Sequence, residues 1–424
     1  MSLPKNALYT NKVQTSYARN YQSQIQPQNG LNYNAGETII INVPTSNNLL
    51  MSGSDTVLKC SLNFSNGAVS TANLDRGGIA GVIQRVRIFH ASTLLSDVDN
   101  YGNLINMMTT LQQSSDTVSG KMQILQGTGN HSGEDLLVAA TADGDKSYEY
   151  SFPLMSILTM TNNYIPLFSM SGSPLRIEIQ LVSSIPKFIT STAALGAHST
   201  KSLLTDVEMV CNFMELSDNA MQIVKNASGP VVQWVVSDFR NYGYNNTLQT
   251  SETQLSVPIP AKFNSLKSLF WSFRQNSAGI AARYANESCK FGLNSYSLRI
   301  GSQTMPTKAP SSTSQFFSEL LRSIGCVSDV NHETNFSKAN YSADTPDAYA
   351  AGVSSKSFYA AMDLESYSNC ESSSIYSGYN SSVDDIFYNP TFNGQVAATN
   401  IRVDTYSMFD SLILIQDGVA TVQY

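Results

Sequence analysis

The chain has 424 residues, which is too long for one small core and suits two domains of about 200 residues each. Its 42% hydrophobic residues exclude a disordered body, and its charged residues reach only 13%, against roughly 25% in an average soluble protein. The net charge of −7 excludes a folded body that coats nucleic acid, because phosphate contacts require basic surfaces. A weakly charged surface suits contact between copies of one protein, since few charges must be desolvated.

The first 36 residues form a distinct segment that is rich in Gln, Asn and Tyr and has no acid before Glu37. It lacks apolar periodicity, so we predict a flexible N-terminal arm over residues 1–36 that carries the cations Lys5, Lys12 and Arg19. Its first residues contain no apolar segment, and we expect neither a signal peptide nor, with apolar runs this short, a spanning helix of about 20 residues. The five cysteines are odd in number and scattered, which predicts free thiols in a reducing compartment.

From Glu37 onward, apolar and polar residues alternate over short segments, as half-buried antiparallel strands require. The clearest case is Leu175–Leu181, where every second residue is Leu or Ile. The same reading applies to Ile39–Val43, Val82–Ile88 and Val207–Phe213. At the end of the chain, Asp417-Gly418 joins two apolar segments and predicts a tight hairpin, because these residues tolerate the positive φ angles of a type I′ turn.

Helical spacing is found in three places. Apolar residues recur on one face between Asp97 and Gln113, and again between Ser314 and Ile324, where Gly325 is placed to end the helix. A third, short helix is predicted near Ser217–Lys225, between the two halves of the chain. The protein should therefore be mainly β, with one helix in a long loop of each half.

Internal repetition links the halves. Val-Arg-Ile ending at Ile88 is echoed by Leu-Arg-Ile ending at Ile300, and each precedes a polar loop and a helix. Three further echoes occur in order: Val-Pro ending at Pro44 and Pro258, the strands Leu58–Phe64 and Leu269–Phe273, and Ile-Gln at Ile179-Gln180 and Ile415-Gln416. The last pair has a wider spacing than the others, which predicts extra residues in one loop of the second half.

These patterns predict an all-β protein of two tandem eight-stranded jelly-roll sandwiches with a short helix in a long loop of each. The predicted boundaries are 37–216 for the first jelly roll, 217–229 for a linker and 230–424 for the second. Lectins and cupins also contain jelly rolls, so the fold alone does not give the function.

Several stretches resemble the major capsid proteins of Polinton-like viruses, adintoviruses and virophages. They are SFYAAMDLESYS (Ser357–Ser368), SGYNSS (Ser377–Ser382), VDTYSMFDSLILIQDG (Val403–Gly418), PAKFNSLKSLFWSFR (Pro260–Arg274) and Leu298–Gly301. The resemblance covers most of residues 37–424 and consists of strand patterns, not catalytic signatures.

The resemblance implies a virion protein made inside the host cell that trimerises into pseudo-hexagonal capsomers and tiles an icosahedral shell. Its partners would be copies of itself, neighbouring capsomers, penton and minor capsid proteins, and in some relatives an internal membrane. Sequence-specific contact with nucleic acid is not expected. Lys5, Lys12 and Arg19 would contact the shell interior. The alternative function is a β-sandwich adhesin or spike protein that binds glycans; a jelly-roll enzyme, which would need a metal, is a third possibility.

The sequence offers little chemistry, and we predict no catalytic, metal or cofactor site. The four histidines lack zinc-binding spacing, and Cys326 with Asp329 and His332 reads as a loop thiol near a surface histidine. Gly127–Gly133 imitates a dinucleotide loop without the strand–helix context that such a loop needs. Three carboxylates could suggest a calcium site but are interpreted as a solvated face: Asp363, Glu365 and Glu371. Trp234 and Trp271 could stack on sugars but are interpreted as core residues.

Overall fold

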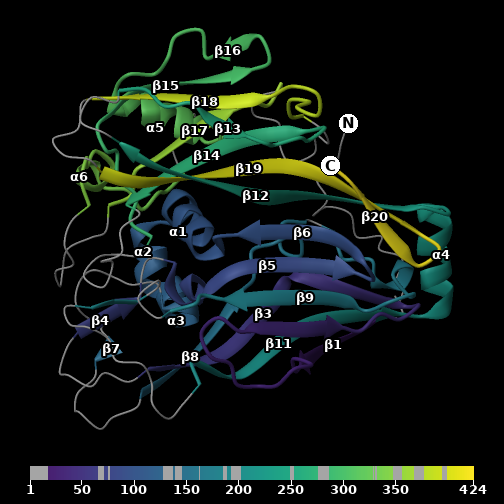
Figure 1. Ribbon diagram of the computed structural model, residues 1–424. Coiled ribbons are helices and arrows are strands. Elements are labelled where there is room, and N and C mark those ends of the chain that lie inside the picture. Colours follow the sequence, from purple (N-terminus) through teal and green to yellow (C-terminus); the bar gives the residue numbers. More distant parts are fainter. Residues whose placement is uncertain are drawn as a thin grey trace, which may run out of the picture.

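The structure is a computed structural model that describes residues 18–64, 71–74, 77–127, 137–138, 146–161, 163–184, 189–191, 202–248, 253–275, 286–327, 329, 332–346, 356–366, 377–393 and 399–424. It is mainly β, and two sandwiches of antiparallel strands lie side by side, the first below the second in Figure 1. The all-β prediction is confirmed.

The first sandwich consists of two four-stranded sheets. One has the order β1-β11-β3-β8, with bounds Ala18–Ile25, Leu204–Leu216, Leu49–Phe64 and Lys146–Pro153. The other has the order β2-β9-β5-β6, with bounds Thr38–Val43, Leu175–Leu181, Ile83–His90 and Thr93–Asp99. A small third sheet joins β10 (Ile189–Ser191), β4 (Thr71–Leu74) and β7 (Leu137–Val138).

The second sandwich repeats this arrangement. Its first sheet has the order β12-β19-β14-β17, with bounds Val232–Leu248, Thr399–Gln416, Leu266–Gln275 and Tyr359–Asp363. Its second has the order β13-β18-β15-β16, with bounds Val257–Ile259, Ile386–Phe392, Leu293–Ile300 and Gln303–Met305. In each sandwich, with the eight strands counted along the chain, one sheet has the order first, last, third and sixth. The other has the order second, seventh, fourth and fifth. Both sandwiches therefore have jelly-roll strand order, and the duplication extends to the topology.

Three of the four sequence echoes fall on equivalent strands. Ile88 and Ile300 lie in β5 and β15, Pro44 and Pro258 lie at β2 and β13, and Phe64 and Phe273 lie in β3 and β14. The fourth echo is wrong, because Ile179-Gln180 lies in β9, whose counterpart is β18, whereas Ile415-Gln416 lies in β19. The extra loop residues inferred from it are wrong too. A two-residue match carries too little information to identify a strand.

The helices lie in the long loops and between the halves. The main ones are α1 (Tyr101–Gln112), α4 (Asp218–Ser228) and α5 (Thr313–Arg322). Short turns of helix are α2 (Ser115–Thr117), α3 (Gln123–Gln126), α6 (Lys338–Tyr341), η2 (Gly78–Val82), η3 (Val118–Met122) and η4 (Leu167–Ser169). The helix predicted from Asp97 begins four residues later, because Asp97 still belongs to β6. No helix in the described ranges is long and apolar enough to cross a membrane.

The predicted arm over residues 1–36 needs correction. Ala18–Ile25 forms β1, which pairs antiparallel with β11 along its whole length, from Ala18 opposite Leu216 to Ile25 opposite Met209. Tyr21 and Ile25 pack against the hydrophobic core and Tyr33 is buried within it. The segment has the composition of a flexible arm because most of its residues are polar, and the same composition fits the exposed edge strand of a sheet. Residues 1–17 lie outside the described residues.

The predicted C-terminal hairpin is present. β20 (Val419–Gln423) pairs with the end of β19, and Asp417 and Gly418 both have positive φ angles of 52° and 78°. This hairpin carries the end of the second jelly roll across to the first, where β20 contacts β6.

Candidate functional site

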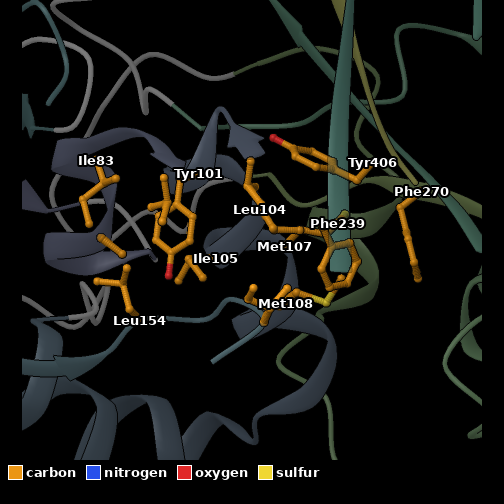
Figure 2. Close-up of a cluster of buried hydrophobic side chains, with 14 of the residues drawn as sticks. Ile83, Tyr101, Leu104, Ile105, Met107, Met108, Leu154, Phe239, Phe270 and Tyr406 are labelled. Carbon is orange, nitrogen blue, oxygen red and sulfur yellow. The ribbon is translucent and has the colours of Figure 1, made fainter. Parts of the chain in front are cut away.

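The surface at which the two jelly rolls meet, here called the seam, is the most elaborate feature of the described chain. Its centre is α1, whose residues Tyr101–Leu111 are all buried. Figure 2 shows Tyr101 pointing toward Ile83 and Leu154 of the first jelly roll, and Met107 pointing toward Phe239 of the second. A helix that is buried all round must pack against two bodies, so α1 joins the jelly rolls as one continuous core.

One side of α1 reaches the second jelly roll through asparagine side chains. Asn103 Nδ2 donates to Tyr406 Oη at 3.0 Å, and Ser272 Oγ donates to Asn103 Oδ1 at 3.4 Å. One turn further, Asn106 Nδ2 donates to the carbonyl oxygen of Asn286 at 3.1 Å. Buried amides are costly unless hydrogen-bonded, so these contacts hold α1 in one register against the second jelly roll.

The end of α1 is closed by the second jelly roll as well. The last carbonyl groups of a helix lack partners within the helix. Here the backbone N–H of Asn335 donates to the carbonyl oxygen of Thr110 at 2.9 Å, and Nε2 of His332 lies 3.0 Å from that of Leu111. The helix thus begins in one jelly roll and is capped by the other.

A charged cluster lies beside the start of α1. The fully buried carboxylate of Asp404 accepts hydrogen bonds from Arg274 Nε and Arg402 Nε, both at 2.8 Å, and from Asn100 Nδ2 at 3.3 Å. Asn100 has a left-handed φ of 49°, which asparagine tolerates better than most residues. Both arginines and Asn100 line a cavity of about 500 Å³ between the jelly rolls. Two guanidinium groups and an amide compensate the one buried carboxylate.

A second buried carboxylate lies further along the seam. Asp238 in β12 is 1% exposed, and its Oδ1 accepts from Ser96 Oγ of β6 at 3.0 Å and from the Phe239 N–H at 2.8 Å. Its Oδ2 has no hydrogen-bond partner among the described residues. Burial raises the pKa of Asp238 from 3.8 to about 7, against the opposing effect of these hydrogen bonds and of Arg240.

The C-terminal hairpin closes the seam. The Ala420 N–H donates to His90 Nδ1 at 3.2 Å, and Tyr424 Oη donates to the carbonyl oxygen of Leu94 at 3.3 Å. Gly418 approaches Gly172 so closely that a Cβ at Gly172 would lie 2.8 Å from the Gly418 carbonyl oxygen. At this glycine pair the two backbones therefore lie against each other across the seam.

No family model and no curated protein matches the sequence, but solved structures match nearly its whole length. The PBCV-1 virus capsid aligns with a TM-score of 0.68 at 10% identity, over 98% of both chains. The Faustovirus major capsid protein aligns with a TM-score of 0.64 at 9% identity, over 97% of this chain and 92% of that one. The mavirus major capsid protein aligns with a TM-score of 0.58 at 11% identity, over 100% and 94%.

This fold is the double jelly roll of viral major capsid proteins. The resemblance noted in the strand patterns is thereby confirmed at the level of the fold. The double jelly roll accounts for both sandwiches and for the helix in a long loop of each.

The candidate nucleophile Cys326 and the candidate base His332 make separate structural contacts. Cys326 Sγ donates to the carbonyl oxygen of Ile324, whereas His332 faces α1. Burial, together with the nearby Asp329, raises the pKa of Cys326, which is opposite to the activation that a nucleophilic thiol needs. Cys60 and Cys211 are free thiols in the core, where burial raises the pKa of each to about 12; Cys370 lies outside the described residues.

The other candidates are also occupied by structural contacts. Asp363 Oδ1 accepts from the Glu365 N–H, and Glu365 Oε1 accepts from Ser377 Oγ, so each of these two carboxylates has a local hydrogen-bond partner. Gly127 ends α3 against the Tyr150 ring. Trp234 and Trp271 are 2% and 0% exposed and belong to the core. Glu371 and residues 128–133 lie outside the described residues.

Of the three cations assigned to the arm, the structure describes one. Arg19 lies in β1, with its guanidinium carbon 5.4 Å from the centre of the Tyr21 ring. Lys5 and Lys12 lie outside the described residues, so their contact with a shell interior stays a prediction. Sequence reasoning missed the seam entirely, including Asn103, Asp404 and Asp238.

Proposed function

We propose that this chain is the major capsid protein of an icosahedral virus, which trimerises into pseudo-hexagonal capsomers and is found in the virion after synthesis inside the host cell. The observation that carries the proposal is the repeated strand order in two jelly rolls that lie side by side (Figure 1). Three such chains around one axis place six similar lobes in a ring, which lets a trimer occupy a hexagonal lattice position.

The composition supports self-assembly. With 13% charged residues, large surfaces can be buried between copies at little desolvation cost. We propose that the partners are other copies of this chain, with penton and minor capsid proteins completing the shell. No residue of the chain is assigned to catalysis.

The test is the mass of the purified protein in solution, measured at low and high salt. We expect a mass of three chains at both salt concentrations, because salt weakens interactions between charges and this interface contains few of them. Negative-stain images should show particles of six-lobed outline. A stable monomer under both conditions would contradict the proposal.

The segment before β1 is proposed to contact the shell interior through Lys5 and Lys12. Deletion of residues 2–17 should leave thermal stability and trimer mass unchanged and lower the yield of closed particles. A deletion that continues through Ile25 should instead give insoluble protein, since it removes β1 and uncovers β11. A normal yield of closed particles after the shorter deletion would show that residues 2–17 are not needed for assembly.

No observation favours the alternative of a glycan-binding adhesin. Its best candidates for sugar stacking were Trp234 and Trp271, and both indoles are buried. Binding of the purified protein to a glycan array without any trimer would nevertheless revive it.

A further inference from the structure

The cavity of about 500 Å³ at the seam lies beside the start of α1 and has walls from both jelly rolls. The first jelly roll contributes the start of β5 and the end of β9, and the second contributes the end of β14 and the start of β19. Sites for small molecules in proteins measure about 300–1,000 Å³. The cavity therefore has the size of a ligand site, and a ligand in it would contact both halves of the chain.

The wall of this cavity is locally positive in a chain whose net charge is −7. Arg274 and Arg402 line it, and none of the described lining residues is acidic. Both guanidinium groups contact the carboxylate of Asp404, which is fully buried outside the wall. Asp99 accepts a hydrogen bond from the lining residue Gln84 but is not part of the wall either. The guanidinium groups thus exceed the carboxylates in direct contact with them by one, which favours an anion in the cavity.

Arg402 is held in place and still has donors available. Its Nε donates to Asp404 Oδ1 at 2.8 Å, which is the one hydrogen bond given for this side chain among the described residues. Its Nη2 lies against the backbone of β12, where a Cβ at Gly243 would be only 2.7 Å away. A guanidinium that is already oriented in this way loses little freedom when its remaining N–H groups bind a ligand.

Amide side chains line much of the rest of the cavity. They come from both jelly rolls and are Gln84, Asn100, Asn103, Gln180, Gln275 and Asn286. An amide both donates and accepts hydrogen bonds, so it can bind the oxygen atoms of an anion or the hydroxyl groups attached to one. An apolar ligand would leave these groups without partners, at a cost in free energy. The wall therefore favours a polar, negatively charged ligand.

We propose that this cavity binds a phosphate group, with Arg402 donating hydrogen bonds and Arg274 adding its charge. The planar fork of a guanidinium matches the oxygen atoms of phosphate. The group belongs either to free inorganic phosphate or to a small phosphorylated molecule, whose hydroxyl groups the amides would bind. Because both jelly rolls supply the wall, the bound anion ties them together and stabilises the folded chain. The inference does not depend on the proposed capsid function.

Isothermal titration calorimetry of the full chain in a phosphate-free buffer tests the site. The probes are inorganic phosphate and ribose 5-phosphate, with ribose and sodium chloride at matched ionic strength as negative controls. We expect binding at one site per chain by a phosphate probe and none by either control. Binding of inorganic phosphate alone identifies the free anion as the ligand, and tighter binding of ribose 5-phosphate identifies a phosphorylated molecule. No binding of either phosphate overturns the proposal.

Two cavity variants and a matched control locate the binding. Arg402→Gln should weaken it roughly tenfold or more, because a charged donor is lost while Arg274 stays paired with Asp404. Gln180→Glu keeps both arginines and places a carboxylate in the wall, so it should weaken binding as well, even if Arg402→Gln does not fold. The control, Arg299→Gln, removes an exposed arginine of β15 that is not part of the wall and should bind like the wild type.

The melting temperature gives a second measurement. A ligand that binds only the folded chain stabilises it, so phosphate should raise the melting temperature of the wild type and of the control more than that of either cavity variant. Equal affinity in the wild type and both cavity variants would place the bound phosphate elsewhere and overturn the assignment. A chain that is monomeric in solution but binds phosphate in this cavity would contradict the capsid proposal alone.

Discussion

The helices α1 and α5 hold equivalent positions in two copies of one fold, yet their surroundings differ. Every residue of α1 from Tyr101 to Leu111 is buried, whereas in α5 only Phe316 and Leu320 are. The inner faces are alike because each covers its own jelly roll. The outer faces differ because the chain supplies a second body for α1 and none among the described residues for α5. After duplication, the outer face of α1 is therefore buried between the jelly rolls, whereas the equivalent face of α5 is exposed in the described chain.

The largest effect is expected where the used surface buries charge. Asp404→Ala should lower the free energy of unfolding by roughly 3–5 kcal/mol, because it leaves Arg274 and Arg402 in the seam without their carboxylate. Asp385→Ala is the control, since this exposed residue pairs with Lys262 on the surface and its loss should have no measurable effect. Denaturant unfolding followed by tryptophan fluorescence measures both. Equal effects would mean that the seam contributes no more than the surface.

A matched pair in the two helices sharpens the comparison directly. Asn103→Ala should cost about 1–3 kcal/mol of unfolding free energy, because it leaves the buried Ser272 hydroxyl without its acceptor and removes the amide that donates to Tyr406 Oη. Gln315→Ala, at the same position of α5, should change the stability of the isolated chain very little, since Gln315 is exposed. If both substitutions lower the free energy of unfolding by the same amount, the buried contacts of Asn103 stabilise the chain no more than the exposed Gln315 does.

The seam should also respond to pH through Asp238. Its pKa in the folded chain, about 7, lies above the ordinary value of 3.8, so between these values the folded chain holds a proton that the unfolded chain has lost. Its contribution to stability is thus greatest at low pH and is lost as the pH rises through this window. Asp238→Asn should unfold at a higher temperature than the wild type at pH 8 and show a smaller difference at pH 5. Melting curves at both pH values decide this, and a lower melting temperature of the variant at pH 8 would contradict it.

The smallest effect concerns reagent access at the end of α5. Cys326 follows this helix and is partly exposed, whereas Cys60 and Cys211 are buried in the first jelly roll. A thiol reagent should label Cys326 in the folded chain, and Cys60 and Cys211 only after denaturation without reductant. Mass spectrometry of digested protein reads the sites. Labelling of Cys60 at the rate of Cys326 would show that the first core opens easily.

Much of the fold was predictable because it depends on local patterns. Alternation in Leu175–Leu181, helical spacing around Leu104 and Phe316, and the Asp417-Gly418 turn each follow from residues close in sequence. β1 was not predicted, because a polar edge strand has an apolar residue only at Tyr21 and Ile25 on its inner face and otherwise resembles an unordered segment.

The seam could not be predicted for a different reason. Asn103 and Asn106 on the outer side of a helix have the pattern of solvent-exposed residues, and nothing near them in sequence signals that Ser272 or Tyr406 will cover them. Asp238 and Asp404 likewise look like the polar half of alternating strands. Their burial depends on the second body, which only the tertiary structure supplies.

The pairing of β12 with β19 has a mechanical consequence. The two strands are matched residue for residue from Val232 opposite Ile415 to Leu248 opposite Thr399, without a register shift. Hydrogen bonds in an antiparallel pair lie perpendicular to the strands. A force pulling the two strands lengthwise in opposite directions therefore loads all these bonds in shear at once, and they must fail together. A force that peels the pair from one end breaks them singly, so we expect this ribbon to resist tension along its axis far better than peeling.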